Sequence, residues 1–245
     1  MTDPDTEYEV LEHIASHGYV VVSPYTYFAF PSSQYKAEWM NGINEWVEKN
    51  LQNNLIKDGN ISKNVNSKKF LLISTLCIGI NPGANLDLTN VFITGHSSGN
   101  HILVNWLKLG CHNIKGVVMI SPVDGVDPYG FFQEYCISPG EKLNFETPTL
   151  IISGGLDGFP GISNTGGLVP PCAPDELSNS RFWKALNGPA WLNNATAFGH
   201  VDFFDDGVVN DILEVRHIFD FKYFHEILKV LLIFNGDCRY YIFVR

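Results

Sequence analysis

Five residues near the middle of the chain have the spacing of a serine nucleophile in a tight turn. Gly95, Ser97 and Gly99 form a Gly-x-Ser-x-Gly pattern, directly after the β-rich run Leu88 to Thr94 and before the amphipathic run Ser98 to Leu109. Glycines at the two outer positions allow the sharp strand-to-helix turn that exposes a serine hydroxyl. Such a hydroxyl can attack a carbonyl carbon, so Ser97 is the candidate nucleophile for acyl transfer.

The residues on either side of Ser97 have separate expected roles. The backbone N–H of Ser98 lies at the expected start of the helix, where it can donate to the oxyanion that forms during acyl transfer. The Ser98 side chain is typical of a helix-start residue. We expect His96 to line the substrate pocket rather than to exchange protons in catalysis.

A serine hydroxyl needs a base to take its proton, and His200 is the best candidate for that base. It follows the expected strand Ala190 to Ala197 and lies in the short loop Phe198 to Asp202. In the α/β-hydrolase fold the histidine comes last of the three catalytic residues along the chain. His217 and His225 lie in a helix-like segment, so we expect them to be surface or packing residues.

Two aspartates could orient that histidine. Asp124 follows the expected strand Gly116 to Ile120, and Asp157 follows the expected strand Thr147 to Ser153. Either position can hold the acid in an α/β-hydrolase. The residue pattern by itself leaves both candidates open.

Strand-like and helix-like segments alternate along the chain, which predicts a mostly parallel sheet with helices on both faces. Besides the segments above, Tyr19 to Val22 is expected to form a strand, and helices are expected at Tyr8 to His17, Tyr35 to Leu51 and Arg181 to Leu186. We expect residues 1–245 to form one domain, because α/β enzymes of this size commonly do.

Composition excludes several classes of partner. The formal charge of −10 disfavours nucleic acid and anionic membranes as partners. A neutral or apolar small substrate fits better.

The sequence also lacks the patterns of metal, membrane and export segments. Five scattered cysteines without a C-x-x-C spacing indicate neither a zinc nor a redox site. Apolar runs fall short of the roughly 20 residues that span a bilayer. The acidic N-terminus lacks a signal-peptide pattern, so we expect a cytoplasmic protein by default.

Several segments together resemble the chlorophyllase family. The resemblance covers residues 8–60 and 82–207, whereas residues 61–81 and 208–245 are atypical of it. The segments that carry the resemblance are Leu11 to Val22, Gly95-His96-Ser97-Ser98-Gly99, Pro122-Val123-Asp124-Gly125, Pro170-Pro171-Cys172-Ala173-Pro174 and Gly199-His200-Val201-Asp202-Phe203-Phe204-Asp205-Asp206.

This resemblance implies an α/β-hydrolase fold and a serine esterase that uses a Ser-His-Asp triad without cofactor or metal. Its implied substrate is the phytyl ester of chlorophyll or another lipid ester. Chlorophyllases tend to have aspartate where this chain has Ser121, and glycine where it has Asp157. Because a histidine without its carboxylate loses about 10⁴ in rate in the serine proteases, we favour Asp157 over Asp124 as the acid.

The start of the chain also departs from the family. Chlorophyllases begin with a strand and a His-Gly-Phe loop that supplies the second oxyanion N–H, whereas only seven residues precede Tyr8. We therefore expect an incomplete N-terminus, and the alternative function is an impaired or noncatalytic hydrolase-fold fragment that binds lipid or pigment. Tyr25, Tyr27 and Phe28 either line an apolar substrate pocket or belong to the core.

Overall fold

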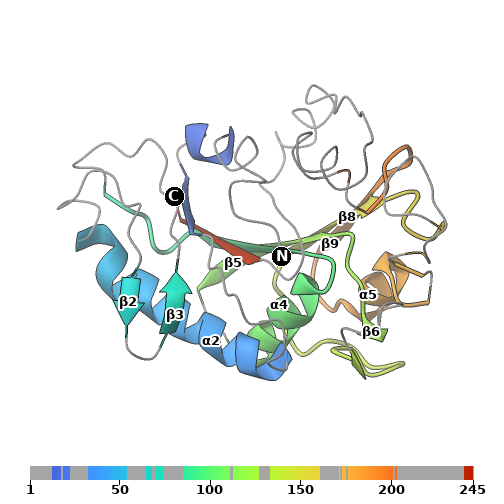
Figure 1. Cartoon of the computed structure of the whole chain (residues 1–245), viewed down its shortest axis with the longest axis horizontal. Helices are drawn as coiled ribbons and strands as arrows, with labels where there is room; N and C mark the ends of the chain where they lie inside the picture. Colours follow the sequence, from blue (N-terminus) through green and yellow to red (C-terminus); the bar gives the residue numbers. More distant parts are fainter. Residues whose placement is uncertain are drawn as a thin grey trace.

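The structure is a computed structural model, and its elements form one central sheet with helices packed against it (Figure 1). It describes residues 13–17, 19–22, 33–53, 65–67, 70–73, 85–110, 113–126, 133–160, 171, 173–174, 176–200, 202 and 240–244. Among these residues, no helix is both long and apolar enough to cross a membrane.

The central sheet has six strands in the order β1-β10-β4-β5-β8-β9. β4, β5, β8 and β9 run parallel to one another, which confirms the expected α/β sheet. The apolar sequences of β4, β5 and β8, rich in valine and isoleucine, suit strands that are buried in the middle of a parallel sheet, whereas β9 forms its edge and exposes Trp191 and Leu192. The strands are β1 (Val20–Val22), β4 (Val91–His96), β5 (Ile114–Ile120), β8 (Thr149–Gly154), β9 (Ala190–Ala195) and β10 (Tyr240–Val244).

The C-terminal strand β10 departs from the expected parallel arrangement. It lies between β1 and β4 and runs antiparallel to both, with Val22 paired with Ile242 and Ile93 paired with the same residue. A segment that no longer resembles the chlorophyllase family therefore borders the strand that leads to Ser97.

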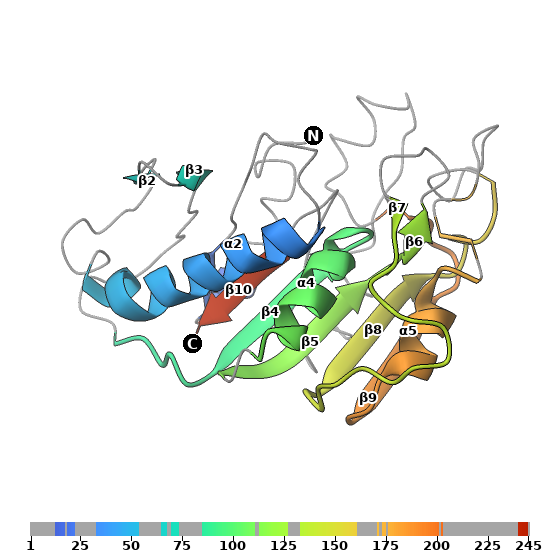
Figure 2. The same cartoon turned by 90° about the horizontal axis from the view of Figure 1, so that it is seen from below.

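Three of the described helices pack on one face of this sheet (Figure 2). They are α2 (Ser33–Trp46), which continues into the π-helical turn η2 (Val47–Leu51), α4 (Gly99–Lys108) and α5 (Asn179–Ala185). A short helical segment at residues 13–16 lies on the other side of the sheet in Figure 1. The helices expected from Tyr35, Ser98 and Arg181 onward are thus confirmed within one or two residues at their N-terminal ends.

Buried apolar side chains join the sheet to α2 and α4. Met40 and Ile43 of α2, Leu103 and Trp106 of α4, and Ile93 of β4 are all at most 1% exposed. These side chains pack α2 and α4 against β4, the strand that leads into the turn at Ser97.

Two small antiparallel pairs complete the described strands. They are β2 (Val65–Ser67) with β3 (Phe70–Ile73) and β6 (Gly125–Val126) with β7 (Gln133–Glu134).

Candidate active site

The turn from β4 into α4 has the backbone strain of a nucleophile elbow. Ser97 has a φ of 52°, in the left-handed region that costs a non-glycine residue about 1–3 kcal/mol. Three hydrogen bonds hold its backbone there: Ser97 N–H donates to the Ile120 carbonyl at 3.0 Å, and the Ser97 carbonyl accepts from Asn100 Nδ2 at 2.9 Å and from Asn100 N–H at 3.2 Å. The sharp turn places Ser97 between the end of the strand and the start of the helix.

The glycine at the start of the motif is required by close packing between β4 and α4. A Cβ atom at Gly95 would lie 2.9 Å from Leu103 Cδ1 and 3.1 Å from the carbonyl carbon of Gly99. A side chain here would therefore require the Leu103 side chain and the backbone at the start of α4 to shift. The spacing of the motif therefore follows from how tightly the helix folds back on its strand.

His200 lies within hydrogen-bond distance of Ser97. Its Nε2 atom is 2.8 Å from Ser97 Oγ, although the two residues are 103 positions apart in the chain. The His200 side chain is 5% exposed, so the contact is largely shielded from water. This geometry allows the imidazole to accept the proton of the serine hydroxyl.

Asp157 lies at the other nitrogen of the same imidazole. Its Oδ1 atom is 3.4 Å from His200 Nδ1, and the aspartate side chain is also 5% exposed. Among the described residues, neither of these two atoms has another hydrogen-bond partner. The distance is long for a hydrogen bond, as catalytic contacts often are in enzymes without substrate. Ser97, His200 and Asp157 thus form a continuous row.

Backbone contacts hold the Asp157 loop and the His200 loop together. Leu156 N–H donates to the Phe198 carbonyl at 3.0 Å. A Cβ atom at Gly154 would lie 2.7 Å from Asp157 Oδ1 and 2.8 Å from the Phe198 carbonyl oxygen. The glycine at the end of β8 therefore leaves the space that the carboxylate occupies.

A second aspartate, Asp202, braces the His200 loop. Its Oδ2 atom accepts a hydrogen bond from Gly199 N–H at 2.6 Å, and the side chain is buried. Sequence reasoning assigned no role to this residue. The Gly-His-x-Asp spacing in the resembling segment was the available signal, since the short side chain of aspartate readily accepts hydrogen bonds from neighbouring backbone N–H groups.

Asp124, the alternative acid, belongs to a separate buried cluster. Its Oδ2 atom accepts a hydrogen bond from Arg181 Nε at 2.5 Å, and its Oδ1 atom accepts one from Cys136 N–H at 2.7 Å. The carboxylate is fully buried, and Arg181 also donates to the Ile137 carbonyl at 2.6 Å. Both carboxylate oxygens of Asp124 are thus engaged in holding loops and α5 together, whereas the His200 ring pairs with Asp157.

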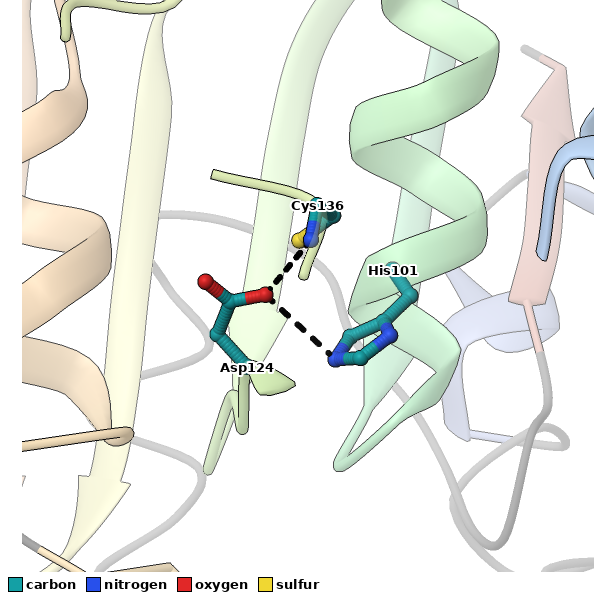
Figure 3. Close-up of side chains that lie close together, drawn as sticks. All are labelled: His101, Asp124 and Cys136. Carbon is teal, nitrogen blue, oxygen red and sulfur yellow. Dashed lines mark hydrogen bonds and ion pairs between the residues drawn. The ribbon is translucent and has the colours of Figure 1, made fainter. Parts of the chain in front are cut away.

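His101, Asp124 and Cys136 also form a group of potential metal ligands (Figure 3). Their ligand atoms lie within 4.8 Å of one another, and His101 Nε2 is 3.7 Å from Asp124 Oδ1. Burial and then the negative charge of Asp124 raise the pKa of the Cys136 thiol well above its ordinary value. Because Arg181 already balances Asp124, these residues are better suited to a structural cluster than to a metal centre.

The raised pKa of Cys136 has a direct chemical consequence. We expect iodoacetamide at pH 8 to leave Cys136 unmodified in the folded protein, because the thiolate is the reacting form and the thiol is buried. After unfolding in urea the same residue should react readily. Mass spectrometry of the peptide that contains Cys136 measures both states, and fast modification of the folded protein would contradict this assignment.

The Arg181 and Asp124 ion pair should contribute strongly to stability. We expect Arg181→Met to lower the free energy of unfolding by about 3–5 kcal/mol, because it leaves a buried carboxylate without its positive partner. The double variant with Asp124→Asn should recover part of this loss. Urea unfolding followed by circular dichroism measures both, and equal stability of the single variant and the wild type would contradict the prediction.

The remaining predicted site residues have different positions. Ser98 directly precedes α4, so its backbone N–H is at the N-terminus of that helix, as expected for an oxyanion donor. His96 is completely buried, and its Nε2 atom lies 2.7 Å from the His200 carbonyl oxygen. This burial favours a role in holding His200 over the substrate contact expected from the sequence. Tyr25, Tyr27 and Phe28 lie outside the described residues.

Ser121 occupies the position where chlorophyllases tend to have aspartate. Its hydroxyl oxygen accepts a hydrogen bond from Gly154 N–H at 3.2 Å, and its own N–H donates to the Ile152 carbonyl at 2.7 Å. Ser121 therefore links the ends of β5 and β8. A serine hydroxyl has no negative charge with which to orient a histidine, and among the described residues Asp157 is the carboxylate within ion-pair distance of the His200 ring.

Comparison with known proteins identifies the family. The family model described as Chlorophyllase matches residues 4–219. Chlorophyllase-2 of Arabidopsis thaliana is 27% identical over 210 residues, which cover 81% of this chain and 56% of that protein. Chlorophyllase-1 of the same plant is 25% identical over 207 residues, which cover 81% of this chain and 54% of that protein. Chlorophyllase type 0 of Chenopodium album is 25% identical over 205 residues, which cover 79% of this chain and 50% of that protein.

The chain thus spans about half the length of the curated relatives it matches. The matched region nevertheless includes the elbow at Ser97, the turn after β8 that contains Asp157, and the loop at His200. Together with the parallel sheet and its strained serine turn, the family match over most of its residues shows that this chain belongs to the chlorophyllase family.

Proposed function

We propose that this chain is a serine carboxylesterase that hydrolyses a lipophilic ester, with Ser97 as nucleophile, His200 as base and Asp157 as the acid that orients it. The observation that carries this proposal is the short distance between His200 Nε2 and Ser97 Oγ, with Asp157 at the opposite nitrogen of the imidazole. A nucleophile, a base and an orienting carboxylate in a row are the arrangement that serine esterases use.

In the first half of the reaction, Ser97 Oγ attacks the carbonyl carbon of the ester while its proton passes to His200 Nε2. The negative charge that develops on the carbonyl oxygen is stabilised by the backbone N–H of Ser98 and the N-terminus of α4. The bond to the leaving alcohol then breaks, and His200 gives its proton to the alcohol oxygen. An acyl group remains on Ser97.

In the second half, water replaces the alcohol. His200 takes a proton from the water as its oxygen attacks the acyl carbon, and then returns that proton to Ser97 Oγ as the acid product leaves. Asp157 keeps the proton of the neutral imidazole on Nδ1 and stabilises the imidazolium in both halves. The burial of both side chains strengthens this interaction.

The proposed substrate class follows from the relatives and from the charge of the chain. The similar proteins are named chlorophyllases, which favours the phytyl ester of chlorophyll or another lipid ester. A net charge of −10 fits a neutral substrate better than an anionic one. We also infer that the chain forms a single hydrolase domain, because segments from residue 20 to residue 244 contribute strands to one sheet.

A fluorophosphonate probe tests the proposed function, because it reacts covalently with activated serines. We expect labelling of the folded protein, with the adduct located on Ser97 by mass spectrometry, and hydrolysis of chlorophyll to chlorophyllide or of a long-chain p-nitrophenyl ester. Hydrolysis of the p-nitrophenyl ester alone would support the broader lipid esterase. Absence of any adduct on Ser97 in folded protein would overturn the proposal and favour the noncatalytic lipid- or pigment-binding alternative.

A further inference from the structure

His96, the residue before the nucleophile, contacts the backbone of the base. Its side chain is completely buried at the end of β4. Its Nε2 atom lies 2.7 Å from the His200 carbonyl oxygen, a separation of 104 positions in the chain. A carbonyl oxygen can only accept a hydrogen bond, so His96 Nε2 must carry a proton and donate it.

The two imidazole rings also lie against each other. Their centroids are 4.8 Å apart, and their planes are inclined by 40°. His96 therefore supports His200 in two ways, through a hydrogen bond to its backbone and through contact with its ring. Because His96 is adjacent to Ser97, the same strand end sets the position of the nucleophile and of its base.

The position of the His200 ring matters because both of its nitrogens have partners. Nε2 lies near Ser97 Oγ and Nδ1 lies near Asp157 Oδ1. A small shift of the His200 backbone would lengthen one of these contacts. The braces on this loop include the hydrogen bond from Gly199 N–H to Asp202 on one side of His200 and the one from His96 to the His200 carbonyl on the other.

We propose that His96 is a positioning residue, whose Nε2–H donor holds the His200 carbonyl and thereby aligns the imidazole between Ser97 and Asp157. This inference rests on the proposed function and deepens it, since it names a further residue that the same site needs. It replaces the expected contact between His96 and substrate, because a side chain with no exposed surface cannot meet a ligand without rearrangement.

Two substitutions separate the donor from simple packing. His96→Leu fills similar space without an N–H group, whereas His96→Gln retains an N–H donor near the end of its side chain. We expect His96→Leu to slow fluorophosphonate labelling of Ser97 by roughly 10- to 100-fold, because misplacing a catalytic group by about 1 Å has effects of this size. His96→Gln should recover much of the rate. Equal thermal midpoints for the two variants would show that packing alone does not explain the difference.

The second measurement does not depend on activity. The proton on His200 Nδ1 should give a low-field NMR signal through its contact with Asp157, and ¹⁵N labelling of histidine identifies it. We expect this signal to shift or disappear in His96→Leu and to remain in His96→Gln.

The outcomes keep the two proposals distinct. An unchanged labelling rate in His96→Leu overturns the positioning role. If the wild type is not labelled at all, the proposed function fails, and the NMR signal then decides: an unchanged signal in His96→Leu overturns the positioning role, and its selective loss supports it.

Discussion

Replacing Ser97 by alanine is expected to reduce the rate of ester hydrolysis by roughly 10⁶-fold, the size of effect that loss of the nucleophile has in a studied serine hydrolase. The reason is that the Ser97 hydroxyl forms the covalent intermediate in the proposed mechanism, and no other hydroxyl is within hydrogen-bond distance of His200 Nε2 among the described residues. The rate with a p-nitrophenyl ester, measured over a wide range of enzyme concentration, gives the loss directly.

Ser138→Ala is the matched control for this substitution. Ser138 is exposed, and it lies in the loop between β7 and β8, away from the turn between β4 and α4. We therefore expect its rate to remain within about twofold of the wild type, since surface substitutions away from special features usually have small effects. A Ser97→Ala protein that folds normally but retains the wild-type rate would contradict the assignment of the nucleophile.

The elbow could be predicted from sequence because its determinants are local. Gly95, Ser97 and Gly99 lie within five residues, and the close approach that excludes a Cβ at Gly95 occurs between adjacent elements. The same holds for the strands and helices on either side, whose apolar patterns indicate buried faces. The contact between His200 and Ser97 could also be predicted, because in the α/β-hydrolase fold the histidine follows the serine and the aspartate along the chain.

Contacts between residues far apart in the sequence could not be predicted as well. The antiparallel strand β10 pairs with β1 and β4, which lie about 220 and 150 residues away, and no local pattern in Tyr240–Val244 indicates which strands it joins. Likewise, Asp124 and Asp157 both follow strands, and only the three-dimensional structure shows that Arg181 takes the first while His200 lies beside the second. The contact of His96 with the His200 backbone depends on the same long-range packing.

A second substitution with a large expected effect is at Asp157, and it distinguishes the roles of the two aspartates. We expect Asp157→Asn to lower the rate of ester hydrolysis by about 10⁴-fold, as the equivalent change does in a serine protease, because an amide cannot hold the histidine in the required tautomer or stabilise its positive charge. Asp124→Asn should instead retain most of the rate in the folded protein and lower its free energy of unfolding, because its carboxylate holds Arg181 and the Cys136 backbone.

These two variants form a matched pair, since each exchanges one buried carboxylate for an amide of nearly the same shape. Their rates are to be compared at a temperature at which both are folded, with urea unfolding curves measured in parallel. The fluorophosphonate reaction should follow the same order, because it too requires His200 to take the Ser97 proton. If Asp124→Asn abolished activity while Asp157→Asn left it intact, the acid would be Asp124, and the row of Ser97, His200 and Asp157 would need another explanation.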